Sequence, residues 1–249
     1  MKVSLITVTY NSEKYIETCI KSVINQDYLN IEYIIIDGNS NDNTKQIINE
    51  YKDNISMFIS ENDKGIYDAL NKGIEISTGD IVGLLHSDDL LHDNNVISRI
   101  VKSFQSDTDC VYSDSYYINQ ITNKKTRYYS SNNFTNWKFS IGLMPSHPTI
   151  YFRSKVLKEY QLYNINYKIA SDFDLILRHF MSYKCRSKYI KDIWVIMREG
   201  GVSTLGYSSK IKITKELLKS CRENKVYTNK FLLSIRYLFK LYGYLNFNF

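Results

Sequence analysis

The first hundred residues alternate short, continuously apolar runs with segments in which apolar residues recur every three to four positions. Runs of the first kind predict buried strands, and the second spacing predicts amphipathic helices. Strands are expected at VSLITVT (3–9), EYIIID (32–37), ISMFIS (55–60) and DIVGLL (80–85), with helices between them at about 12–25, 43–51 and 65–77. Apolar strands separated by helices predict an open, doubly wound α/β fold: a mostly parallel sheet with helices on both faces.

The regular alternation stops after a predicted helix at about 94–105 and the strand DCVYSD (109–114). Residues 115–170 predict short strands and loops, among which HPTIYFR (147–153) is the clearest strand. The segment SDFDLILRHFM then restores helical periodicity. After it, IWVIMREGGVST (193–204) predicts a strand that runs into a Gly-Gly loop.

A polar cluster follows each of the first four predicted strands. The clusters are TYNS (9–12), DGNSNDNT (37–44), ENDKGIYDALNKG (61–73) and HSDD (86–89). In doubly wound sheets ligands bind beyond the carboxyl ends of the strands. The pattern therefore predicts that four strand ends converge on one polar site.

Asp88 and Asp89 stand side by side where the fourth strand leaves the sheet. Adjacent carboxylates repel each other, and keeping both ionised is costly unless a cation neutralises them. Mg²⁺ or Mn²⁺ is commonly held by one or two carboxylates, together with water and substrate phosphates. The pair thus indicates a metal–diphosphate site, but a helix N-cap before LLHDNNVI explains an aspartate here equally well.

The other polar residues have similar alternatives. Asp37 ends an apolar strand and could bind a base or ribose, or it could form an Asx turn in DGNS. Lys64 and Lys72 could meet phosphates or remain solvated, and Asp63 is equally ambiguous. No single one of these residues decides the chemistry.

Together these segments resemble the family 2 glycosyltransferases, which have the GT-A fold. The motifs that carry the resemblance are SLITVTYN, IIIDGNSNDNT, DKGIYDALNKGIEISTGDIVGLLHSDD, HPTIYFR, ASDFDLILR and GGVS. Their order and spacing cover residues 3 to about 204. The similarity is greatest to bacterial enzymes that build O-antigen, capsule or exopolysaccharide repeat units.

The resemblance implies a nucleoside diphosphate sugar donor, expected to be a uridine diphosphate (UDP) sugar, and Mn²⁺ or Mg²⁺ as cofactor. It assigns Asp89 as the metal ligand and Asp172 as the catalytic base that deprotonates the acceptor hydroxyl. His147 and Arg198 are expected near the acceptor or the diphosphate. The positions that it assigns to donor binding are Thr7, Thr9, Tyr10, Asp37, Asp63, Lys64, Lys72 and Asp88.

Two positions depart from the family pattern. His86 stands where an Asn often precedes Ser-Asp-Asp, and Ser171 replaces the Glu of a Glu-Asp-like pair. The segment SDFD also predicts a helix start, with Ser171 as its cap and Asp172 in its first turn. Asp174 is expected to be structural, and His92 and His179 are expected to have no role in the site.

The net charge of +6 lies mostly in the C-terminal part, where nine Lys or Arg after residue 209 face only Glu216 and Glu223. Basic residues form a helical stripe there, and an apolar face follows it: Lys212, Lys215, Lys219 and Arg222, then Phe231, Leu232, Ile235, Leu238, Phe239 and Tyr242. This combination is typical of helices on anionic membranes. The alternatives are a helical hairpin that packs on the domain, or a dimer contact.

Scattered cysteines and the lack of a signal or spanning segment in the sequence predict a cytoplasmic protein, peripheral on the inner face of the membrane. We expect one GT-A domain at 1–204, with a donor half (1–114) and an acceptor half (115–204), and a basic helical extension at 205–249. The predicted activity is an inverting, metal-dependent glycosyltransferase that acts on a glycan or lipid-linked glycan acceptor, with no nucleic-acid partner. The alternatives are a metal-dependent phospho- or nucleotidyltransferase and a non-enzymatic membrane scaffold.

Overall fold

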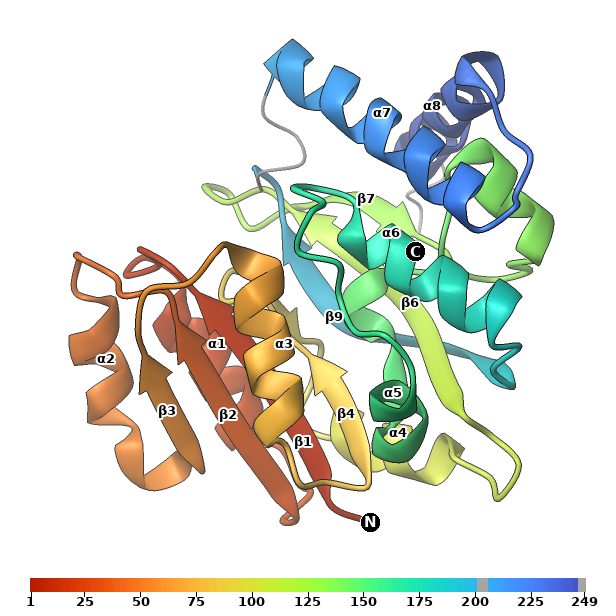
Figure 1. Cartoon of the computed structure of the whole chain (residues 1–249). Helices are drawn as coiled ribbons and strands as arrows, with labels where there is room; N and C mark the ends of the chain where they lie inside the picture. Colours follow the sequence, from red (N-terminus) through yellow and green to blue (C-terminus); the bar gives the residue numbers. More distant parts are fainter. Residues whose placement is uncertain (201–205, 246–249) are drawn as a thin grey trace.

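The computed structural model describes residues 1–200 and 206–245. This part of the chain forms one mixed β-sheet with helices on both faces, α3 and α6 in front of it and α1 behind it in Figure 1. The strands are β1 (Val3–Thr9), β2 (Ile31–Asp37), β3 (Met57–Ser60), β4 (Ile81–Leu84), β5 (Leu90–Leu91), β6 (Cys110–Ile118), β7 (Lys125–Tyr129), β8 (Tyr151–Arg153) and β9 (Ser187–Arg198). The α-helices are α1 (Ile16–Ile24), α2 (Thr44–Glu50), α3 (Ile66–Ile76), α4 (Val96–Ser103), α5 (Ser154–Glu159), α6 (Ser171–Leu177), α7 (Gly206–Glu223) and α8 (Lys230–Leu245).

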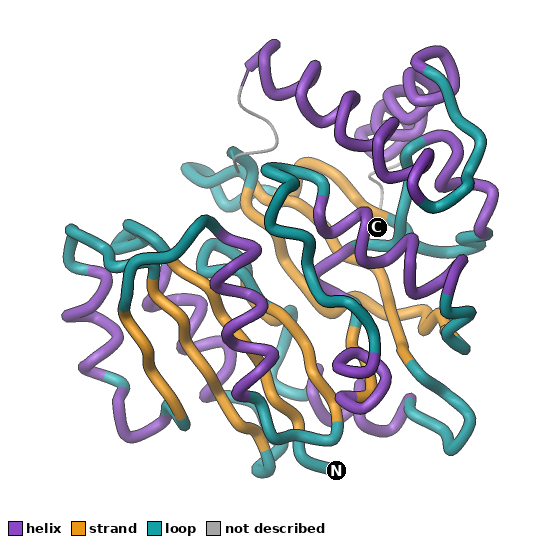
Figure 2. Tube along the Cα trace, in the orientation of Figure 1, coloured by secondary structure: helices purple, strands orange, loops and turns teal. Residues whose placement is uncertain are grey.

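The sheet runs in the order β3-β2-β1-β4-β8-β6-β9-β5, and β7 pairs with the outer part of β6. Strands β1 to β4 are mutually parallel, which confirms the predicted alternation of strands and helices. Beyond β4 the directions are mixed, because β8 is antiparallel to both β4 and β6 whereas β9 is parallel to β6. The tube in Figure 2 shows the resulting two parts of one continuous sheet.

Each face of the sheet carries its own hydrophobic core. Leu5 of β1 packs with α1, α2 and α4, whereas the next residue, Ile6, packs with α3, α6 and α7 on the opposite face. Every residue of β1 is buried. This burial on both sides explains why the first four strands are continuously apolar instead of alternating.

The strand predicted at 147–153 is only half correct. His147–Thr149 form a short 3-10 turn with Pro148 in it, and only Tyr151–Arg153 belong to β8. A proline in a strand interior would remove a ladder hydrogen bond, which accounts for the late start. The neighbouring strand β4 accommodates Tyr151 at Gly83, where an added Cβ would lie 2.0 Å from the ring.

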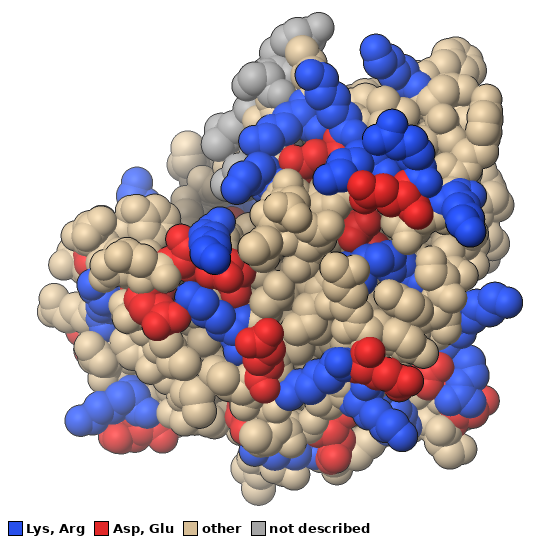
Figure 3. Space-filling view, viewed as in Figure 1, with Lys and Arg blue, Asp and Glu red and all other residues tan. Residues whose placement is uncertain are grey.

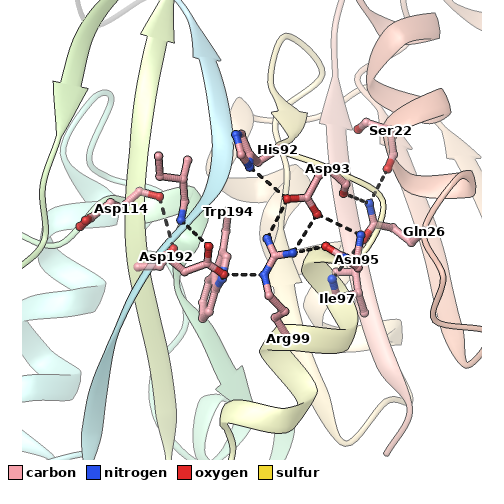
Figure 4. Close-up of polar contacts among 12 residues, drawn as sticks. Ser22, Gln26, His92, Asp93, Asn95, Ile97, Arg99, Asp114, Asp192 and Trp194 are labelled. Carbon is pink, nitrogen blue, oxygen red and sulfur yellow. Dashed lines mark hydrogen bonds and ion pairs between the residues drawn. The ribbon is translucent and has the colours of Figure 1, made fainter. Parts of the chain in front are cut away.

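A polar network behind the sheet involves the second half of the motif HSDDLLHD (Figure 4). Arg99 of α4 donates two hydrogen bonds of 2.9 Å to Asp93 and one of 2.6 Å to Asp192 of β9. His92 contacts the same Asp93 at 3.1 Å. These contacts tie α4 to β9, so His92 has structural partners and lies in this network.

The C-terminal helices pack on the domain. Leu217, Cys221 and Leu233 are buried in the same core as α6. The outward surface of α7 is basic, and Figure 3 shows Lys and Arg gathered over it at the top of the view. Several large apolar side chains of α8 remain exposed: Phe231, Tyr237, Leu238, Phe239, Leu241, Tyr242 and Tyr244. Within residues 1–200 and 206–245, no helix combines the length and apolar character needed to cross a membrane.

Candidate functional site

The carboxyl ends of β1, β2 and β3 bring together the loops that the sequence analysis placed in one site. A Cβ added to Gly38 would lie 2.6 Å from the Asp63 carboxylate and 3.4 Å from the Tyr10 ring. Tyr10 is 59% exposed. The Asp63 carboxylate also accepts a hydrogen bond of 2.7 Å from the Gly65 backbone N–H at the start of α3. Tyr10 and Asp63 therefore both lie next to Gly38.

Asp37, at the end of β2, is fully buried. Its carboxylate accepts hydrogen bonds from Ser60 Oγ (2.6 Å), from the Ser40 backbone N–H (3.0 Å) and from Ser40 Oγ. Ser40 lies three residues beyond Asp37, so this is not the bond to the second residue that defines the Asx turn expected for DGNS. The contacts occupy both carboxylate oxygens. A direct role of Asp37 in donor binding stays a prediction.

The two threonines of β1 differ in their surroundings. The Thr7 hydroxyl is fully buried and lies 3.2 Å from the Tyr33 hydroxyl. The Thr9 hydroxyl, at the end of the strand, is buried and has no hydrogen-bond partner. An unpaired buried hydroxyl is costly, so Thr9 is better suited to meet a ligand group than Thr7.

Lys64 and Lys72 are found at the start and the middle of the α3 region. Lys72 pairs with Glu61 at 2.7 Å and with Asp68 at 3.4 Å, and Lys64 is exposed. Contacts of either lysine with a donor stay a prediction.

Asp88 and Asp89 lie in a tight turn that follows β4. The Asp89 backbone N–H donates a 2.9 Å hydrogen bond to the His86 carbonyl, which closes the turn before β5. The Asp89 side chain is only 2% exposed, and its Oδ2 atom has no hydrogen-bond partner. Burial, and then the neighbouring Asp88 carboxylate, raise the pKa of Asp89 well above its usual value.

These properties fit a divalent cation. A buried carboxylate oxygen without a partner, beside a second carboxylate, is the environment that a hard cation compensates. Among the described residues no three His, Cys, Asp or Glu side chains form a group that could hold a metal. Asp89 would therefore be its protein ligand, with Asp88 beside it and the other ligands supplied by water or substrate phosphate.

Arg198 lies beside this acidic turn because of strand pairing. Leu90 of β5 pairs with Ile196 of β9, so the residues that precede Leu90 stand opposite the end of β9. Arg198 donates hydrogen bonds to the Asp88 carbonyl (2.7 Å) and to the Thr18 hydroxyl (3.1 Å). The structure thus brings Arg198 to the proposed metal side of the site. Residues 201–203 of the GGVS motif lie outside the described residues.

The rings of His86, His147 and Tyr163 lie next to one another. The rings of His86 and His147 are 5.7 Å apart, and His147 Nε2 is 2.7 Å from the Tyr163 hydroxyl. Burial, followed by the charge of Asp172, raises the pKa of Tyr163 well above normal. Burial lowers the pKa of His147 to about 3, so this imidazole is neutral at physiological pH. Tyr163, which the sequence analysis missed among 22 tyrosines, thus contacts His147 and lies within electrostatic range of Asp172.

Asp172 has the properties of a base poised near neutrality. It is half-buried in the first turn of α6. Burial raises its pKa to about 6, opposed by a 2.8 Å hydrogen bond from the Phe173 backbone N–H. A general base with a pKa near the working pH is ionised and still able to take a proton.

Asp174 instead supports the helix packing. It is 3% exposed, pairs with Arg178 at 2.8 Å and accepts a 2.7 Å hydrogen bond from Ser220 of α7. The structural role expected for Asp174 agrees with these contacts.

The prediction that Ser171 caps α6 is wrong. Its hydroxyl donates a 3.0 Å hydrogen bond to the Asn164 carbonyl, and α6 has no side-chain cap. Instead, Glu216 of α7 accepts 2.9 Å hydrogen bonds from the backbone N–H groups of Lys168, Ile169 and Ala170. A carboxylate from α7 thus holds the turn that leads into α6, and no local sequence pattern around position 171 indicates it.

Replacing Glu216 by alanine is expected to lower the free energy of unfolding by about 2–3 kcal/mol, because three backbone donors lose a charged acceptor. Denaturant unfolding measures the change. The control is Glu50→Ala, an exposed glutamate of α2 that should stay within about 0.5 kcal/mol of wild type. Equal stability of the two variants would contradict the role of Glu216.

Comparison with known proteins relates this site to one family. The model of the family described as "Glycosyl transferase family 2" matches residues 4–171. The protein is 25% identical over 221 residues to a PGL/p-HBAD biosynthesis glycosyltransferase from Mycobacterium bovis, with 87% of this chain and 82% of that protein covered.

Solved structures share the fold. The crystal structure of S. aureus TarS 1–349 in complex with UDP-GlcNAc matches with a TM-score of 0.71 at 19% identity, over 91% of this chain and 68% of that chain. A second TarS crystal structure contains a longer chain, of which this protein spans 41%. Glucosyl-3-phosphoglycerate synthase from Mycobacterium tuberculosis, in complex with Mn²⁺, UDP and phosphoglyceric acid, matches with a TM-score of 0.62 at 16% identity, over 88% of this chain and 78% of that chain.

Proposed function

The chain belongs to glycosyl transferase family 2 and has the GT-A fold, and from this premise we propose that it transfers a sugar from a UDP-sugar to a hydroxyl group of a glycan acceptor. The proposal rests on two carboxylates, which we place in one site. Asp89 is buried with an unpartnered oxygen, and Asp172 has a pKa raised to about 6. Tyr163 bonds to His147 and has a pKa raised in part by the charge of Asp172, which supports placing the two sides in one site.

Each carboxylate has a separate task in an inverting transfer. Asp172 accepts the proton of the acceptor hydroxyl as that oxygen attacks the anomeric carbon from the face opposite the diphosphate. Asp89, with Asp88 beside it, would hold Mn²⁺ or Mg²⁺, which offsets negative charge on the departing diphosphate. The neutral His147 contributes hydrogen bonding without charge near the acceptor or the diphosphate.

The donor half of the site is proposed to lie at the ends of β1 to β3. Tyr10 and Asp63 lie next to Gly38 at these strand ends, and the buried Thr9 hydroxyl has no hydrogen-bond partner. Solved relatives of the same fold contain UDP, UDP-GlcNAc or GDP-Man, which supports a nucleotide-sugar donor of this class. The transferred group is a hexose or an N-acetylhexosamine.

The acceptor is proposed to be a lipid-linked oligosaccharide or polysaccharide of a bacterial surface glycan, reached at the inner face of the cytoplasmic membrane. Exposed Lys212, Lys215 and Arg222 on α7 and the exposed apolar side chains of α8 support peripheral attachment. Each Lys or Arg near an anionic membrane surface contributes about 1 kcal/mol to the free energy of membrane binding. Co-sedimentation with neutral and with anionic vesicles measures membrane binding. Equal binding to the two kinds of vesicle would contradict attachment through the basic residues.

The proposed division of the chain has a donor half at 1–114 and an acceptor half at 115–204, followed by the helical extension at 205–249. The site residues support the first boundary, because Asp89 belongs to the first segment and His147 and Asp172 to the second. The extension contributes Glu216 and Ser220 to the packing of α6.

Incubation with UDP-glucose, UDP-galactose, UDP-GlcNAc and UDP-GalNAc, each with Mn²⁺, Mg²⁺ or EDTA, tests the function. At least one donor is expected to release UDP slowly to water, and only when a divalent ion is present. Release of GDP from GDP-sugars, without release of UDP from any UDP-sugar, would show that the donor nucleotide is not UDP. Consumption of nucleoside triphosphates without any sugar donor would favour a phospho- or nucleotidyltransferase, and no consumption at all would favour a scaffold.

A further inference from the structure

Arg127 of β7 is a cation with no acidic partner. Its guanidinium lies 4.8 Å from the ring centre of Tyr117, 5.2 Å from that of Tyr129 and 5.7 Å from that of Tyr244 in α8. Within residues 1–200 and 206–245 it forms no ion pair, and its buried Nε has no hydrogen-bond partner. Three aromatic rings thus surround a guanidinium whose hydrogen-bonding capacity is unused.

Strand register places Arg127 in one row with the acidic turn. Arg127 pairs with Tyr117 of β6, and Tyr117 pairs with Met197 of β9. Asp89 directly precedes Leu90, the partner of Ile196, and so stands next to Met197 in this row. Paired residues on neighbouring strands share a face of the sheet. Three strand spacings separate Arg127 from Asp89, about 14 Å between Cα atoms.

Tyr129 lies within electrostatic range of both Arg127 and Asp172. It stands two residues further along β7, on the same face as Arg127. Burial raises the pKa of Tyr129 to about 12, Arg127 opposes this rise and Asp172 adds to it. Arg127 and Asp172 therefore both lie within electrostatic reach of one phenol. The guanidinium thus shares a row with the acidic turn and a neighbouring phenol with Asp172.

The surroundings of Arg127 carry surplus positive charge. Lys240 of α8 has a pKa lowered by burial, and then by Arg127 and Lys210. Glu199, which raises the pKa of Lys240, already accepts a 2.7 Å hydrogen bond from Thr126. Partly buried cations that repel one another are expensive without an anion. A guanidinium held flat by aromatic rings presents a fork of donors that matches a phosphate group.

We infer that Arg127 binds a phosphate-class oxyanion at the rim of the active site. The inference rests on the proposed function for the identity of that oxyanion, which is either the diphosphate of the donor or the phosphate of a lipid-linked acceptor. The Tyr117–Tyr129–Tyr244 cage orients the guanidinium, and α8 closes over it at Gly243, where an added Cβ would lie 3.5 Å from Arg127 Nε. The helix with the exposed apolar side chains thus completes the anion site.

Isothermal titration calorimetry of wild type, Arg127→Gln and Arg127→Lys separates the two sources. UDP with Mg²⁺ probes the donor diphosphate, and inorganic pyrophosphate added to protein saturated with UDP and Mg²⁺ probes an acceptor phosphate. Arg127→Gln is expected to weaken one of the two bindings by about tenfold or more, and Arg127→Lys is expected to weaken it less. The matched control is Arg236→Gln, whose guanidinium lies 5.0 Å from the Tyr237 ring and bonds to Thr214; it should leave both affinities unchanged.

Unchanged affinity for both probes in folded Arg127→Gln would overturn the inference. If that variant does not fold, phenylglyoxal modification of wild type decides. Protection of Arg127 by UDP or by pyrophosphate, measured by mass spectrometry, supports an anion site, and no protection by either overturns it. These measurements need no turnover, so an inactive wild type would contradict the proposed function and leave the anion site standing.

Discussion

Asp172→Asn is expected to lower turnover by about 10²-fold or more while leaving donor affinity nearly unchanged, because the variant keeps the shape of the side chain but cannot take a proton. The Phe173 backbone N–H can still donate to the amide oxygen of the variant, so α6 should keep its position. Initial rates with a UDP-sugar and calorimetric titration of UDP measure the two quantities. Asp53→Asn, an exposed change in the turn after α2, serves as the control and should match wild type.

The pH dependence of kcat/KM tests the role of Asp172 independently. Asp172 must be ionised to act, and burial raises its pKa to about 6. The kcat/KM of wild type should therefore rise about tenfold per pH unit below pH 6 and level off above it. Asp172→Asn should lack this inflection. Wild-type rates in Asp172→Asn, or an unchanged inflection, would show that another group is the base.

Asp89→Asn is expected to abolish the metal-dependent part of donor binding, a loss of about 10²-fold or more, since even indirect disturbance of a metal site costs 10- to 100-fold. Donor affinity is measured with and without Mn²⁺. In wild type, Mn²⁺ together with UDP should raise the melting temperature, because they bind only the folded state. The variant should not respond to Mn²⁺, and a full Mn²⁺ response would rule out Asp89 as the ligand.

Although Asp89→Asn is expected to weaken donor binding, it should not lower the free energy of unfolding of the metal-free protein. The pKa of Asp89 is raised in the folded state, so the folded state holds this proton more tightly than the unfolded state. The raised pKa therefore lowers the stability of metal-free wild type at pH 7, and this penalty shrinks as pH falls from the raised pKa to the usual value of an aspartate. Asp89→Asn carries no such charge, so the metal-free variant should be at least as stable as wild type at pH 7.

The donor half was predictable because its signals are local. Each of β1 to β4 is a short apolar run followed by a helix with regular periodicity, and parallel strands of this kind place their carboxyl ends at one edge. The position of Asp88 and Asp89 after the fourth strand followed directly. Residue patterns alone did not decide between metal ligand and helix cap; the structure, where Asp89 has a buried and unpartnered oxygen, favours the first.

The acceptor half was less predictable because its contacts join distant segments. Arg198 meets Asp88 only through the two-residue strand β5, which is too short to have a recognisable pattern. Tyr163 reaches His147 from a loop. The role of Asp172 came from resemblance to a family, since SDFD alone reads as an ordinary helix start.

The contacts of Glu216 determine which segments of the chain can be exchanged in engineered chimeras. Because α7 supplies the carboxylate that holds the turn before α6, together with Ser220 on Asp174, these helices belong to the acceptor half mechanically. A chimera that took residues 115–204 from one relative and α7 from another would combine Asp172 with an α7 that need not carry the carboxylate of Glu216. Recombination should therefore transplant α6 and α7 as one unit, whereas the β1–β4 segment can be exchanged as another.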